Sequence, residues 1–183
     1  KSSYGSIISS EIYDGETIDA RKEQVGWNTV GFNDAAWSSV GIANSGFDHL
    51  LATYNEPIRK QSVFKAVKLI VTPKGEQVID FGQNLVGWVK VKASGKSGDA
   101  ITIKHAEVLD RFGNFYTENM RKAKTTAKYT LKGEGVEEFE PHFTFFGFRY
   151  IKVEGYPGKI DPENFVAISM NSDMEQTGSF STS

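Results

Sequence analysis

Short runs of β-branched and aromatic residues recur from residue 62 to residue 170, and each run ends in glycine, proline, asparagine or aspartate. No segment carries the i, i+3, i+4, i+7 spacing of apolar residues that an amphipathic helix keeps over three turns. Strands are therefore predicted at 62–72, 76–81, 85–93, 100–108, 125–133, 142–155 and 163–170. Short strands joined by turns, with no helices between them, indicate an all-β chain. We expect an antiparallel β-sandwich of the jelly-roll or concanavalin-like type.

The first 57 residues have a different character. The stretch 26–40, GWNTVGFNDAAWSSV, is rich in glycine, asparagine and serine, and its large aromatic residues are irregularly spaced. Such a stretch favours loop or end-cap structure whose rings pack on a neighbouring surface. We expect residues 1–57 to be the C-terminal part of a preceding N-terminal β-sandwich domain, or an extension packed on the next one. Residues 58–183 are expected to form the main, accessory β-sandwich domain.

Charge and cysteine content exclude several functional classes. The 21 basic and 23 acidic residues nearly cancel, so no net field favours nucleic acid or an anionic membrane. The absence of cysteine excludes disulfides and thiolate ligands. No apolar run approaches the roughly 20 residues that span a bilayer. We predict no nucleic-acid partner and no membrane partner.

Specific catalytic motifs are missing. The sequence holds no G-x-S-x-G elbow, no phosphate-binding glycine loop, no EF-hand and no pair of histidines at metal-ligand spacing. His105 shares a strand face with Ile101 and Ile103, which predicts a half-buried histidine bonded to a neighbouring group more readily than a base. Two of the acids Glu107, Asp110 and Glu118 could form a glycosidase pair, but a chain with 23 acids offers many such pairs. We predict no catalytic residue, no metal and no cofactor.

The stretch 78–91, VIDFGQNLVGWVKV, combines an acid, a Gly-Gln-Asn corner and a tryptophan. Asp80 ahead of the corner at 82–84 predicts a tight connection between two strands, with Gly82 at positive φ or in close backbone contact. Gly87 beside Trp88 leaves room for a large ring over the neighbouring strand. The ring of Trp88 either packs in a core or interface, which is the commoner outcome, or stacks on a sugar.

The loop 109–123, LDRFGNFYTENMRKA, is long for a connection between two strands. Its aromatic residues stand beside polar groups suited to sugar hydroxyls. The candidate sugar-binding residues are Tyr116, Glu118 and Asn119, together with Trp88. The loop could instead pack against an adjoining domain, and in both cases we expect it to lie at one end of the sandwich.

Several stretches in order resemble a known family. VIDFGQNLVGWVKV, HAEVLDRFGNFYTENMRKAKTTAKYTLKG, FEPHFTFFGFRYIKVEGYPG and SDMEQTGSF resemble the β-sandwich module that precedes the catalytic domain of bacterial α-L-rhamnosidases, glycoside hydrolase family 78. The upstream EIYDGE, GWNTVGFNDAAW and PIRKQ resemble the end of that family's N-terminal domain. The resemblance implies a parent hydrolase with an α/α-barrel catalytic domain beginning just after Phe180. None of the family's catalytic carboxylates maps onto this chain, and no segment matches its calcium-dependent rhamnose-binding module.

The resemblance implies a non-catalytic role, in which this region braces the catalytic domain of a hydrolase acting on terminal α-L-rhamnosides. A carbohydrate-binding module that uses exposed aromatic residues is the alternative, and a self-sufficient small hydrolase is a third reading. Solvent exposure of Trp88, Tyr116 and Phe146 in a groove would favour sugar binding. The expected partners are the parent's own catalytic domain and rhamnose-containing glycans. The compartment stays open between the bacterial cytoplasm and export.

Overall fold

The computed structural model describes residues 5–44 and 46–182, and over these residues its regular elements are strands and short 3-10 turns. The strands are β1 (Ile7–Glu11), β2 (Gly15–Asp19), β3 (Ile58–Lys65), β4 (Lys68–Val71), β5 (Gln77–Ser94), β6 (Ala100–Ala106), β7 (Thr126–Thr130), β8 (Val136–Phe139), β9 (Phe146–Glu154) and β10 (Phe165–Ser172). The 3-10 turns are η1 (Ala20–Lys22), η2 (Glu118–Met120) and η3 (Pro162–Asn164). The all-β prediction is confirmed.

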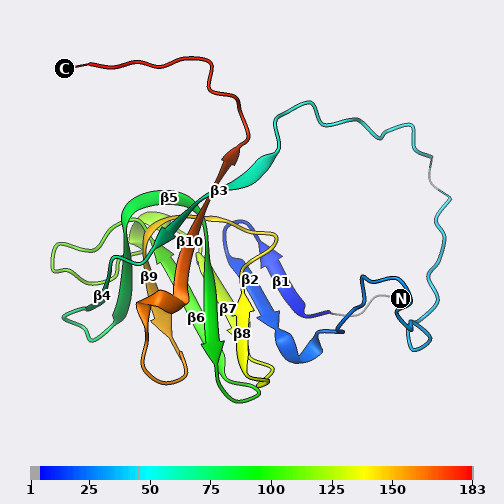
Figure 1. Cartoon of the computed structure of the whole chain (residues 1–183), viewed down its shortest axis with the longest axis horizontal. Coiled ribbons are helices and arrows are strands. Elements are labelled where there is room, and N and C mark those ends of the chain that lie inside the picture. Colours follow the sequence, from blue (N-terminus) through cyan, green and yellow to red (C-terminus); the bar gives the residue numbers. More distant parts are fainter. Residues whose placement is uncertain (1–4, 45, 183) are drawn as a thin grey trace.

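The strands form one sheet that curls around a single core (Figure 1). The order along the sheet is β1-β2-β7-β6-β9-β5-β10-β3, and β4 and β8 pair with β5 beside this path. Every pairing is antiparallel except that of β2 with β7, which is parallel. The inward faces of strands from β2 to β10 meet in the same apolar cluster, which includes Phe148 and Phe165, both fully buried. The curl therefore builds the two facing layers of a sandwich from a continuous sheet.

Strand β5 corrects the prediction of a tight connection at 82–84. It runs unbroken for 18 residues, and the Gly-Gln-Asn corner is an irregularity within it, where the register against β9 shifts between Asp80 and Leu85. Gly82 takes a φ of 84°, as expected for a glycine that re-aims a strand. One half of β5 pairs with β4 and the other with β8 and β10, so the bend lets a single strand serve both parts of the sheet.

Gly87 has a different role from the one expected. A Cβ at this position would lie 1.8 Å from the carbonyl oxygen of Ile168 on β10. The glycine is therefore required by the close approach of two paired backbones, rather than by space for the ring of Trp88.

Three further differences concern the strands. The stretch predicted as one strand at 62–72 divides into β3 and β4, and β8 was not predicted because its four residues, VEEF, include two acids. The hairpin of β1 and β2 lies in residues 1–57, which were expected to belong to a preceding domain or a packed extension and for which no strand was predicted, and it joins the main sheet through β7. The described residues between 23 and 57 contain no strand, and Figure 1 draws most of them as a long extended trace.

Candidate functional site

The loop between β6 and β7 is the candidate site, and it does not stay at one end of the sandwich as expected. Strand β6 ends at Ala106, opposite Tyr150 of β9. The loop then turns back along the sheet, so that the ring of Phe115 lies 5.5 Å from the Nζ atom of Lys152 on the outward face of β9. The loop therefore covers part of a sheet face, between β6 and the turn that leads from β4 into β5.

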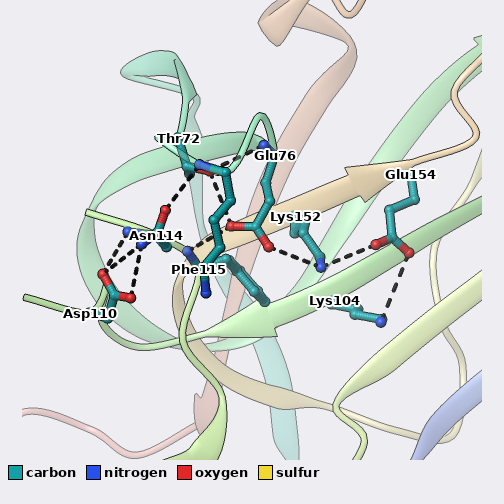
Figure 2. A network of polar contacts seen from close by, with 9 residues as sticks. Thr72, Glu76, Lys104, Asp110, Asn114, Phe115, Lys152 and Glu154 are labelled. Atoms are coloured by element: carbon teal, nitrogen blue, oxygen red, sulfur yellow. Dashed lines mark hydrogen bonds and ion pairs between the residues drawn. The ribbon is translucent and has the colours of Figure 1, made fainter. Parts of the chain in front are cut away.

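A carboxylate at that turn anchors the middle of the loop (Figure 2). Glu76 accepts hydrogen bonds from the backbone amide of Phe115 at 3.0 Å, from the hydroxyl of Thr72 at 3.1 Å and from Nζ of Lys152 at 3.3 Å. Burial alone would raise the pKa of Glu76, but these hydrogen bonds outweigh it and hold the pKa below its ordinary value. Glu76 is thus a structural anion that ties the loop to two strands.

The first part of the loop is closed by its own side chains. Asp110 accepts hydrogen bonds from the backbone amides of Phe112 and Asn114, both at 2.8 Å. The buried side chain of Asn114 donates to Asp110 at 3.0 Å and accepts from the amide of Lys74 at 3.2 Å. These groups stabilise the loop itself, and no cluster of three or more metal-ligating side chains occurs among the described residues.

The half-buried carboxylate of Glu107, which has two amide partners, lies beside the bend of β5. The side-chain amide of Asn84 donates to Glu107 Oε1 at 3.0 Å, and that of Asn119 donates to Glu107 Oε2 at 3.4 Å. Glu118 is exposed at the start of η2, and Tyr116 is half-buried. One loop therefore holds three of the candidates, Tyr116, Glu118 and Asn119. The structure adds Asn84 of β5, which donates to the same carboxylate as Asn119.

Trp88, the remaining candidate, is engaged elsewhere. Its side chain is 9% exposed, its indole Nε1 donates to Glu140 Oε2 at 3.0 Å, and Nζ of Lys60 lies 5.3 Å from its ring centroid. Phe146 is 3% exposed. The burial of both rings agrees with packing rather than with an open platform for a sugar.

The far end of the loop is held by a buried histidine. His105 Nδ1 lies 2.9 Å from the carbonyl oxygen of Thr125, whose hydroxyl donates to the carbonyl of His105 at 3.0 Å. The imidazole stacks on Phe146 with ring centroids 3.9 Å apart, and it is fully buried rather than half-buried as expected. Burial lowers the pKa of His105 to about 4, so the ring is neutral at pH 7. The two hydrogen bonds of His105 join the end of β6 to Thr125, whose backbone has a strained φ of 45°.

Two family models match successive parts of the chain. Residues 70–171 match the family model of the bacterial α-L-rhamnosidase concanavalin-like domain, and residues 1–62 match that of the α-L-rhamnosidase N-terminal domain. The chain belongs to the α-L-rhamnosidase family. The resemblance inferred from the sequence motifs is thereby confirmed.

Relatives show how much of such a protein this chain represents. An α-L-rhamnosidase of Streptomyces avermitilis is 42% identical over 97% of this chain, which spans 17% of that protein. One of Formosa agariphila is 37% identical over 98% of the chain, which spans 20% of it. The chain therefore spans about a fifth of the length of these relatives.

Solved rhamnosidase structures share the fold. The native enzyme of Aspergillus terreus superposes with a TM-score of 0.88 at 43% identity, over 96% of this chain and 20% of that one. The Streptomyces avermitilis enzyme, complexed with L-rhamnose, superposes with a TM-score of 0.86 at 42% identity, over 92% of this chain and 16% of that one. Within the described residues, no helix is long and apolar enough to cross a membrane.

Proposed function

We propose that this chain is the non-catalytic β-sandwich region of an α-L-rhamnosidase and that it braces the catalytic domain, an α/α-barrel that cleaves terminal α-L-rhamnosides. The observation that carries the proposal is the set of exposed large apolar side chains along one extended segment. Between residues 25 and 58 these side chains are from 48% to 107% exposed. They are Val25, Trp27, Val30, Trp37, Val40, Ile42, Phe47, Leu50, Leu51, Tyr54 and Ile58.

A run of this kind is costly to leave in water. Each large apolar side chain that becomes buried contributes roughly 1.5–3 kcal/mol, so a segment with many of them favours a packed partner. The relatives are about five times longer than this chain, since it spans 17–20% of them. The partner in our proposal is therefore the remainder of the parent polypeptide.

The buried carboxylates support a structural rather than a catalytic role. Asp80 is bonded to Arg149, Asp19 to Arg21, and Glu16 to the backbone amides of His142 and Phe143. Asp80 and Glu16 each hold two distant parts of the chain together, whereas Asp19 binds its near neighbour Arg21, and all three acids are committed to fixed donors. A general acid needs a proton to give and an open path to the glycosidic oxygen, which such positions do not provide.

Activity of the isolated chain tests the non-catalytic role. We expect no release of nitrophenol from an aryl α-L-rhamnoside by the highly purified 183-residue chain. Turnover that disappears when a carboxylate of this chain is changed would overturn the proposal.

Bracing is tested in the full-length enzyme. Val40→Asp and Leu51→Asp should lower its melting temperature by several degrees, about 2–4 °C per kcal/mol, because each places a charge in a buried contact. Val71→Asp, a change of an exposed residue on β4, is the matched control. Equal effects of the three changes would count against packing of the segment.

A second candidate function is carbohydrate binding. The half-buried Glu107, with its amide partners Asn84 and Asn119, offers planar polar groups, and Asn119 lies in the same loop as Tyr116. These groups suit the hydroxyls of a rhamnose-containing glycan. Titration calorimetry of the chain with a rhamnose oligosaccharide would support this function only if Asn119→Ala weakens binding.

A further inference from the structure

A hollow of about 740 Å³ is lined by residues of β1, β2, β7 and β8. It lies between the β1–β2 hairpin and the segment that leads out of β8. Its walls are largely apolar, and two of its rings, Trp27 and Phe143, are 54% and 68% exposed. The apolar lining includes Ile7, Ile18, Trp27, Tyr129, Phe139 and Phe143.

The strands beside the hollow have free edges. Strand β1 ends the sheet order and pairs only with β2 among the described residues, and β8 pairs only with β5 in that same part of the chain. The outer side of β1 therefore presents backbone N–H and C=O groups that none of the described strands uses. A free edge next to an apolar wall is a template for the addition of a further strand.

Most of the charged groups around the hollow have partners within the chain. Glu138 binds Lys90 and Lys92, and Glu140 binds Lys60 and the indole of Trp88. The hydroxyl of Tyr129 donates to Glu137 at 3.2 Å. Since these groups are satisfied, the hollow offers mainly apolar surface to an occupant, which fits an apolar peptide better than a sugar rich in hydroxyls.

We propose that the hollow and the free edge of β1 receive an extended apolar segment of the parent polypeptide from outside residues 1–183. This segment adds to β1 as a strand, and its inward side chains fill the hollow. The proposal rests on the proposed function, in which the chain is part of a longer rhamnosidase. The relatives supply the length that this requires, because the chain spans only 17–20% of them. A volume of about 740 Å³ admits several side chains, and cavities of roughly 300–1,000 Å³ are typical of filled binding sites.

The same substitution in two contexts tests the proposal. Phe143→Gln removes an exposed ring and keeps the backbone amide that bonds to Glu16 at 3.0 Å. In the 183-residue chain its melting temperature should change by about 1 °C or less, and in the full-length enzyme it should fall by about 4 °C or more. Equal shifts in the two contexts would overturn the proposal.

Hydrogen exchange provides a second measurement that does not depend on a variant. In the full-length enzyme, the amides of Ile7–Glu11 that do not bond to β2 should exchange at least about 100-fold more slowly than in the chain alone. Equal rates would show that nothing adds to this edge. Rhamnoside hydrolysis by the chain alone, the test of the proposed function, is a separate readout, so either proposal can fail without the other.

Two other occupants give distinct results. A dimer of the chain that Phe143→Gln disperses, measured by analytical ultracentrifugation, would assign the hollow to a second copy and overturn the proposal. Binding of a rhamnose oligosaccharide that changes tryptophan fluorescence, and that is lost in Phe143→Gln, would assign it to a glycan and overturn the proposal as well.

Discussion

Asp80 and Arg149 form a two-point ion pair across the bend of β5. Arg149 Nε donates to Asp80 Oδ1 at 2.9 Å and Nη2 donates to Oδ2 at 3.1 Å, while the amide of Gly82 donates to Oδ1 at 2.7 Å. Burial alone would raise the pKa of Asp80, but these donors hold it below its ordinary value. The carboxylate therefore fixes both the irregular turn of β5 and its position against β9.

Asp80→Ala should destabilise the chain by about 1–3 kcal/mol, because it leaves the Gly82 amide without its acceptor and frees Arg149. Urea unfolding followed by tryptophan fluorescence measures the change. Glu134→Ala, which removes the exposed ion pair with Lys132, should leave the midpoint unchanged. If Asp80→Ala behaved like Glu134→Ala, the pair would not hold the bend.

Gly87→Ala should be far more damaging than Gly75→Ala. The added Cβ at Gly87 would meet the carbonyl oxygen of Ile168 at 1.8 Å, whereas nothing lies within 4 Å of the corresponding position at Gly75, where φ is 79°. Gly75→Ala thus reports only the backbone cost, about 1 kcal/mol, and Gly87→Ala should cost more than about 3 kcal/mol. Similar unfolding midpoints for the two variants would refute the close approach of β5 and β10.

The buried His105 should make stability depend on pH in a defined window. Its pKa falls from the ordinary 6.5 to about 4 in the folded chain because burial disfavours the charged ring. The unfolded chain therefore binds the proton first, so the stabilisation is complete above pH 6.5 and is lost as the pH falls toward 4. The slope should reach about 1.4 kcal/mol per pH unit.

His105→Gln should lower stability at neutral pH and flatten this slope. His49 and His142 are exposed and remain in both proteins, so the comparison of urea unfolding at several pH values isolates His105. Identical slopes in the two proteins would mean that the ring is protonated in the folded state or reached by water.

The double substitution Tyr116→Ala and Asn119→Ala should lower the stability of the full-length enzyme, because it removes packing contacts of the loop. We expect a melting temperature lower by about 2–4 °C, which corresponds to roughly 1 kcal/mol, with an unchanged KM for rhamnoside. A rise in KM alone would favour sugar contact. Lys122→Ala, an exposed position of the same loop, is the control. A double variant with the melting profile and kinetics of the unchanged enzyme would mean that the loop is merely solvated.

The alternation of apolar residues and turn residues determined the fold class. A period of two places every second side chain on one face of a strand, so the positions of β6, β7, β9 and β10 could be predicted within a few residues. Specific motifs also allowed the family to be predicted from the sequence, because VIDFGQNLVGWVKV and the stretches after it occur in the order that the family shows. The four-residue β8 and the β1–β2 hairpin lack this signal, since short strands are stabilised by the neighbours that they pair with.

Only the tertiary structure decided how the polar residues are used. The corner at 82–84 has turn residues, yet β5 continues through it because Asp80 and Arg149 hold the chain across the bend. Trp88 and His105 could each have faced solvent, and their burial depends on β10, β9 and Glu140, which are far away in sequence. Local sequence specifies which face a side chain takes on its strand, whereas the partner that covers that face comes from long-range pairing.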